Sequence, residues 1–168
     1  HVRASAARLL GMIADPPPPL LTKTLVHVAL HDCDAETRFA AARAIGMLRH
    51  NVTSPQLLDQ LWNHLFDSDS FVRSAAALVL GQLGDMAGTA QIISHLTRLL
   101  EDEDIYTREA AARALGRIGA AAATPEVIEA LTRAAQDSDL QVHEAATDAL
   151  VMLREARANP DAEIVVAA

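Results

Sequence analysis

The segment DSDSFVRSAAALVLGQL, residues 67–83, recurs in related forms along the chain at a spacing of 35 residues. Its arginine recurs as Arg3, Arg38, Arg73 and Arg108, and its glycine as Gly11, Gly46, Gly81 and Gly116. A fixed period of this length is typical of tandem repeats, in which each unit packs on its neighbours and the stack shares one core. The period therefore predicts a solenoid with a surface suited to binding. It does not indicate a catalytic reaction or identify the partner.

Apolar and acidic positions keep the same register. One column contains only alanine: Ala6, Ala41, Ala76, Ala111 and Ala146. A second contains large aliphatic residues: Leu10, Ile45, Leu80, Leu115 and Leu150. Two columns are acidic: Asp32, Asp67, Asp102 and Asp137, then Asp34, Asp69, Asp104 and Asp139. Because an apolar column shared by all units is typical of a continuous core, we expect Leu80 and Leu115 to be buried between layers.

Each unit is predicted to contain two helices. Apolar residues at helical spacing place the first helices at about residues 20–31, 55–66, 90–101 and 125–136. Each second helix is expected to begin after an aspartate of the second acidic column, whose carboxylate caps the free backbone N–H groups. The second helices end near Gly84 or Gly119 in the units that have these glycines. Short joints make neighbouring helices antiparallel, so the sequence predicts an all-α array of about nine helices.

The whole chain, residues 1–168, is predicted to form one repeat array. Its units cover about residues 1–15, 20–50, 55–85, 90–120 and 125–155, and residues 156–168 form a tail or the start of a further unit. His1 stands directly before a repeated Val-Arg pair, and Pro160 follows Pro125 by one period. We therefore interpret the chain as an excerpt from a larger protein.

Composition restricts the possible partners. The chain has 22 acidic and 14 basic side chains and a formal net charge of -8, which argues against nucleic acid as the main ligand. No apolar run approaches the length of a membrane span, so no membrane partner is expected. The single cysteine, Cys33, excludes an intramolecular disulfide and suits a reducing compartment, which favours a cytoplasmic location.

The pattern D-x-D-x-x-V-R-x-x-A-A-x-x-L-G-x-L in residues 67–83 resembles the HEAT repeat, in the variety named after phycobilisome lyases. Residues 102–118 and 32–48 are similar to it, with Thr107 and Thr37 in place of the valine. The resemblance covers nearly the whole chain. It implies a right-handed α-α superhelix of the HEAT or armadillo type, in which the second helices line the concave face.

The resemblance also implies a structural ladder. In HEAT proteins of this kind, a turn aspartate and an arginine six residues later form hydrogen bonds between neighbouring repeats. The matching pairs here are Asp32 with Arg38, Asp67 with Arg73, and Asp102 with Arg108. We expect these side chains to point into the inter-repeat turns and away from a ligand groove. In the fourth pair His143 replaces the arginine, so the ladder is expected to be weaker at that end.

A variable stripe on the second helices is the candidate binding surface. It combines aromatic side chains, methionine and arginine, which are the residue types enriched in interface anchors. The candidates are Phe39, Arg43, Met47, Phe71, Leu78, Tyr106, Arg113 and Arg117. For Phe71 and Tyr106, a role in covering the neighbouring repeat is equally expected. The three arginines are expected to suit a partner with acidic or carboxylate features.

Two histidine motifs contain residue types that occur in metal or catalytic sites. The pair His143-Glu144 resembles part of the metal shell of a HEAT-type di-iron hydroxylase, but one such pair cannot build that site, so a solvated helix face is favoured. His27 and His31 have the i, i+4 spacing of two metal ligands on a helix. Their equivalents in other units are different residue types, which favours a variable outer stripe. We predict no catalytic residue, no metal and no cofactor.

The sequence thus predicts a non-catalytic scaffold or sensor module that binds a protein or peptide along its concave face. Other domains of the same full-length chain are among the candidate partners. Two alternatives stay open. One is a subunit of a bilin lyase, in which the concavity would hold a tetrapyrrole on a phycobiliprotein. The other is a regulatory repeat segment of a large signalling ATPase.

Overall fold

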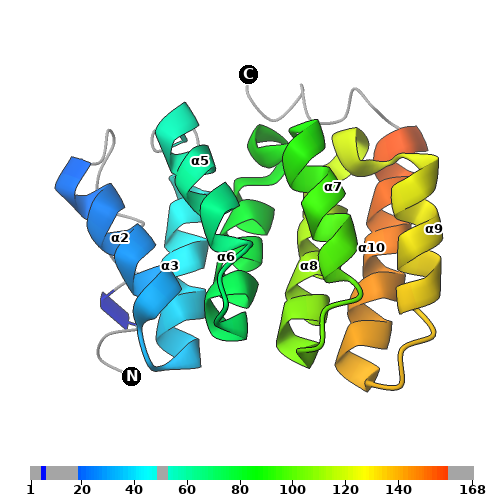
Figure 1. Cartoon of the computed structure of the whole chain (residues 1–168). Coiled ribbons are helices and arrows are strands. Elements are labelled where there is room, and N and C mark those ends of the chain that lie inside the picture. The colour runs from blue at the N-terminus through cyan, green and yellow to red at the C-terminus, as the bar shows by residue number, and fades with distance from the viewer. Residues whose placement is uncertain (1–4, 7–18, 49–52, 159–168) are drawn as a thin grey trace.

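The computed structural model describes residues 5–6, 19–48 and 53–158, which form an α solenoid (Figure 1). The predicted all-α repeat architecture is confirmed, and no strand occurs among the described residues. The first helices form one layer: α2 (Pro19–His31), α5 (Pro55–His64), α7 (Ala90–Leu99) and α9 (Pro125–Ala134). The second helices form the other: α3 (Ala35–Met47), α6 (Ser70–Leu83), α8 (Ile105–Ile118) and α10 (Leu140–Ala158). The ninth helix, expected in residues 1–15, falls outside the described residues apart from residues 5–6, which are helical.

Each second helix begins directly after the aspartate that the repeat indicates. The side chains of Asp34, Asp69 and Asp104 accept hydrogen bonds from backbone N–H groups in the first turn of α3, α6 and α8. Asp139 does the same for α10, accepting from the N–H of Gln141 at 2.9 Å. The second acidic column is therefore a set of helix caps.

The first helices have caps that the sequence analysis did not identify. Ser54, Thr89 and Thr124 accept hydrogen bonds from backbone N–H groups two residues inside α5, α7 and α9. These helices also end about two residues earlier than predicted. In α5, for example, Phe66 N–H donates to Asn63 O, and this i to i+3 bond tightens the last turn into a 3₁₀ form.

The turns after α6 and α8 contain the only positive φ angles among the described residues. Gly84 has φ 62° and Gly119 has φ 76°, a region that side chains with a Cβ rarely adopt. Two short 3₁₀ helices begin at these glycines, η1 (Gly84–Ala87) and η2 (Gly119–Ala122), and the sequence analysis did not predict them. They connect α6 to α7 and α8 to α9.

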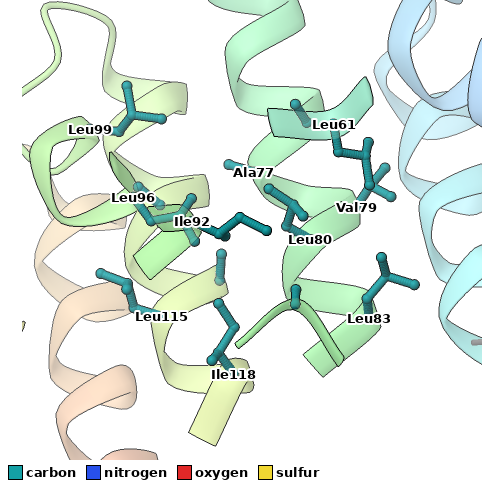
Figure 2. Close-up of a cluster of buried hydrophobic side chains, with 14 of the residues drawn as sticks. Leu61, Ala77, Val79, Leu80, Leu83, Ile92, Leu96, Leu99, Leu115 and Ile118 are labelled. Carbon is teal, nitrogen blue, oxygen red and sulfur yellow. The ribbon is translucent and has the colours of Figure 1, made fainter. Parts of the chain in front are cut away.

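The core lies between the two helix layers. Leu80 and Leu115 are fully buried, as predicted, and Figure 2 shows them among leucine and isoleucine side chains from α5, α6, α7 and α8. Leu150, their equivalent in the last unit, is only partly buried. No described helix is both long and apolar enough to cross a bilayer.

The repeated glycines allow neighbouring second helices to approach closely. A Cβ at Gly81 would lie 2.8 Å from Ala114 Cα, and one at Gly116 would lie 2.9 Å from Ala149 Cα. At Gly46 the obstruction is different, because a Cβ there would lie 2.9 Å from both Cβ and O of Gln82. The glycine column is thus a column of backbone contacts, with one departure at the α3/α6 junction.

Candidate binding groove on the second helices

A groove of about 540 Å³ crosses α3, α6 and α8, which are second helices of three consecutive units. We call it the second-helix groove. Its lining residues are Glu36, Arg38, Phe39, Ser74, Ala75, Leu78, Tyr106, Glu109, Ala110, Arg113 and Arg117. Small side chains at positions 74, 75 and 110 leave room between the larger ones, and this contribution was not foreseen from the sequence.

Five of the eight candidate binding residues line this groove: Phe39, Leu78, Tyr106, Arg113 and Arg117. Phe39 is 42% exposed and Tyr106 is 60% exposed, so two aromatic rings face solvent beside the partly buried Leu78. On α8, positions 106, 113 and 117 are separated by seven and four residues, which places them on one face of the helix.

The other three candidates lie outside the lining. Met47, near the end of α3, is 60% exposed. Arg43 is exposed and lies close enough to Arg117 to affect its pKa. Phe71 is half-buried beneath the guanidinium of Arg38, whose central carbon lies 3.2 Å from the ring centroid. Phe71 therefore covers the neighbouring unit, which was one of the two roles considered for it.

The arginines of the groove have different electrostatic surroundings. Arg113 forms an ion pair with Glu109 on the same helix, with both Nε and Nη2 at 2.9 Å from Oε1. The pKa of Arg117 is lowered by burial first, and then by the positive charges of Arg113 and Arg43. Three like charges therefore gather at one side of the groove.

The ladder arginines Arg73 and Arg108 link adjacent units. Arg73 donates two hydrogen bonds to the carboxylate of Asp102, at 2.9 and 2.8 Å, and also binds the carbonyl oxygen of Asp67. Arg108 makes the same set of contacts, with Asp137 at 2.8 and 3.3 Å and with the carbonyl oxygen of Asp102. Each guanidinium thus joins its own turn to the carboxylate of the next unit.

These contacts change the protonation of the aspartates. Burial by itself raises the pKa of Asp102, but hydrogen bonds from Arg73 and from the Asp104 N–H lower it below its ordinary value. For Asp137, the hydrogen bonds from Arg108 and from the Asp139 N–H lower the pKa. The ladder therefore favours the ionised carboxylates.

Arg38 departs from the expected ladder geometry. It binds the carbonyl oxygen of Asp32 at 2.9 Å, as its equivalents do, but its guanidinium lies over Phe71 and lines the second-helix groove. We expected the ladder side chains to point away from the groove, and for Arg38 this prediction is wrong. The ring of Phe71 on the next helix holds the Arg38 guanidinium at the groove. At the other end of the array, His143 bonds the carbonyl oxygen of Ala135 through Nδ1 at 2.6 Å.

A row of aromatic rings lies on the first helices α2, α5 and α7. The ring of His31 lies 5.0 Å from that of His27 and 5.8 Å from that of His64, measured between centroids. His95 lies 3.9 Å from Phe66 and also contacts Trp62. Trp62 and Phe66 share repeat columns with His27 and His31, but His64 and His95 do not, so column comparison indicates only part of this row. No group of three or more His, Cys, Asp or Glu within the described ranges is arranged to hold a metal ion.

Comparisons with known proteins support the repeat architecture. A family model described as HEAT repeats matches residues 1–81, 22–98 and 93–165, without singling out the phycobilisome-lyase variety. A crystal structure of an engineered protein from the Northeast Structural Genomics Consortium is similar with TM-score 0.58 and 25% identity, covering 96% of this chain and 79% of that one. A second engineered protein from the same consortium has TM-score 0.55 and 26% identity, covering 91% of this chain and 44% of its own. No curated protein matches the chain.

Proposed function

The chain belongs to the HEAT repeat family, and on that premise we propose that its second-helix groove binds a segment of another protein or of the same full-length protein. In this role the chain is an interaction scaffold or a sensor module. HEAT repeats are typical of protein-interaction scaffolds, and the residues that line the groove vary from unit to unit.

The observation that carries the proposal is the exposure of large apolar side chains inside a groove with a charged rim. The side chains of Phe39 and Tyr106 are exposed on either side of Leu78, so much of their apolar surface is not buried in the core. Apolar surface of this kind, bordered by polar groups, is typical of a protein-binding site. Burial of aromatic rings by a partner is also the usual source of binding energy at such sites.

The groove chemistry favours binding over catalysis. Of its two carboxylates, Glu36 and Glu109, the second is held in an ion pair by Arg113. We therefore assign the groove no catalytic role and no cofactor. The single cysteine of the chain favours a reducing, cytoplasmic environment for this module.

A tetrapyrrole is the second candidate occupant, because its propionate groups would also suit arginines beside aromatic rings. Titration with biliverdin distinguishes the two, since a bilin held in the groove shifts its visible absorbance. A protein-binding module is expected to leave the bilin spectrum unchanged at micromolar concentrations.

The proposal is tested by selecting displayed 12-residue peptides on the chain and measuring their affinity by calorimetry. Phe39→Ser combined with Tyr106→Ser should weaken binding of a selected peptide at least tenfold, about 1.4 kcal/mol, because both rings lose contact with the peptide. The melting temperature should change little, since both side chains are exposed.

The matched control combines Leu140→Ser with Val151→Ser, which removes two exposed apolar side chains from α10. This control should leave peptide affinity unchanged. If the groove variant binds normally while Trp62→Ala on α5 abolishes binding, the ring row on the first helices is the binding face and the proposal is wrong.

A further inference from the structure

The positive charge beside the second-helix groove is concentrated on arginines that lack acidic partners. Within the part of the chain that the structure describes, no carboxylate lies within ion-pair distance of Arg43 or Arg117. In contrast, Arg113 is paired with Glu109, and Arg133 is paired with Glu129. Two unpaired guanidinium groups thus flank a pocket in a chain whose formal net charge is -8.

Like charges lie close together here while the groove is empty. Arg117 lies partly out of water and close to two other positive charges, and both conditions disfavour its charged form. An arginine keeps its charge nevertheless, so the repulsion persists until an anion enters. A feature that disfavours the free protein and would be relieved by a ligand is typical of a binding site.

The neighbouring side chains restrict the kind of anion. Phe39, Leu78 and Tyr106 line the same groove, so an occupant needs an apolar group next to its negative charge. Glu36 and Glu109 also line it and would repel a phosphate group with two negative charges more strongly than a carboxylate group with one. The planar guanidinium fork matches a carboxylate through two parallel hydrogen bonds.

We propose that the segment bound in the second-helix groove carries Asp or Glu side chains on either side of an aromatic or aliphatic residue. Arg43 and Arg117 receive the carboxylates, Phe39, Leu78 and Tyr106 receive the apolar side chain, and Arg113 stays paired with Glu109. This inference rests on the proposed function and specifies the partner's chemistry.

The test compares peptides selected on two forms of the chain. Peptides selected from a random displayed library on the unaltered chain should be enriched in Asp or Glu next to Phe, Tyr, Trp or Leu. Selection on the charge-reversed form, Arg43→Glu with Arg117→Glu, should instead enrich Lys or Arg at those positions. Both arginines are exposed, so circular dichroism should show an unchanged fold.

Calorimetry on one selected peptide then measures the contacts. Replacing its acidic residues by Gln or Asn should weaken binding to the unaltered chain at least tenfold, and should strengthen binding to the charge-reversed form, because it removes a repulsion between like charges. The control, Arg98→Glu with Arg154→Glu, makes the same change in net charge away from α3 and α8 and should bind the peptide normally.

Each outcome separates this inference from the proposed function. Selected peptides that lose affinity with Phe39→Ser and Tyr106→Ser but lack acidic residues, and that tolerate charge reversal, would overturn the inference and leave the groove as a binding site. Peptides that tolerate all of these changes would overturn both. Tighter binding of poly(U) RNA than of any selected peptide, lost on charge reversal, would replace the acidic protein segment by nucleic acid.

Discussion

The α3/α6 junction differs from the α6/α8 and α8/α10 junctions, although the same columns of residues meet at all three. At the later junctions an arginine binds the next unit's aspartate through two hydrogen bonds, as Arg73 does with Asp102. At the α3/α6 junction, the equivalent Arg38 lies over the ring of Phe71. The glycine contact differs as well, because Gly46 packs against Gln82 while Gly81 packs against Ala114.

We attribute the difference between the junctions to a single position. Ala114 and Ala149 contact the glycines of the preceding helices, and their equivalent in α6 is Val79. The branched side chain of Val79 is completely buried and is too large for a backbone contact of that kind. The close contact therefore lies one turn further along α6, at Gln82. The two arginine–aspartate ion pairs thus occur at the junctions where a glycine packs against an alanine.

The irregular α3/α6 junction also contains a polar group without a hydrogen bond. Gln82 Nε2 is buried without a hydrogen-bond partner among the described residues. An unsatisfied buried donor is costly, and it adds to the loss of the ion pair at the same junction. We therefore expect the α3/α6 junction to open at lower denaturant concentration than the α6/α8 junction.

The largest expected effect is at the tight junctions. Leu80→Ala should lower the free energy of unfolding by roughly 2 to 5 kcal/mol, because the leucine is fully buried between layers and its removal leaves a cavity. Urea denaturation followed by circular dichroism measures the change. Leu140→Ala is the control, and at an exposed position it should change stability by less than about 0.5 kcal/mol.

The two kinds of arginine contact are compared by removing each. Arg73→Ala should cost on the order of 1.5 to 3 kcal/mol, since it leaves the mostly buried carboxylate of Asp102 without its charged partner. Arg38→Ala should cost less, about 1 kcal/mol, because it removes a contact with an aromatic ring. Peptide binding by the Arg73 variant should persist wherever the fold survives. Equal costs for the two variants would contradict the distinction between the junctions.

Acid should weaken the later junctions selectively. The pKa values of Asp102 and Asp137 are lowered in the folded chain, so the unfolded chain binds protons first as the pH falls below about 4. The stability due to these two carboxylates is therefore complete above the unfolded pKa and is lost as the pH falls through the folded pKa. Urea titrations between pH 2 and pH 7 should show this loss in the unaltered chain, and a smaller loss in Arg73→Ala. A parallel pH dependence in the two proteins would count against the ladder as its source.

The smallest expected effect comes from repairing the irregular junction. Val79→Ala should allow α3 and α6 to approach and Arg38 to reach Asp67. The gain should offset part of the burial lost with the two methyl groups, roughly 0.8 kcal/mol for each. Val127→Ala, at a buried valine of α9, is the control and should show the uncompensated cost. A crystal structure of Val79→Ala with Arg38 still over Phe71 would show that valine is not the cause.

The sequence was most informative where structure depends on nearby residues. The starts of the second helices follow from Asp34, Asp69, Asp104 and Asp139, because a cap acts over two or three residues. The burial of Leu80 follows from the helical period. The caps Ser54, Thr89 and Thr124 are equally local and could have been identified from the sequence.

The groove was only partly predictable. Helical spacing placed Phe39, Leu78 and Arg117 on one face, and the structure brings them into one groove. The lining by Arg38 and the burial of Phe71 depend on how two helices from different units meet, which a column of equivalent residues does not show. The row of rings from His27 to His95 is similar, since His64 and His95 join it from repeat positions other than those of His27 and His31.

By itself the sequence determined the repeat, the helices, their caps and the buried columns of this HEAT chain, because these depend on the period and on hydrogen bonds over a few residues. Only the tertiary structure decided which arginine binds an aspartate, which one lines the groove, and which exposed rings stand together. These contacts depend on the distances between helices that are separated by about 35 residues in the sequence. Such distances are set by the side-chain volumes on both helices, and we attribute the spacing at the α3/α6 junction to the buried Val79.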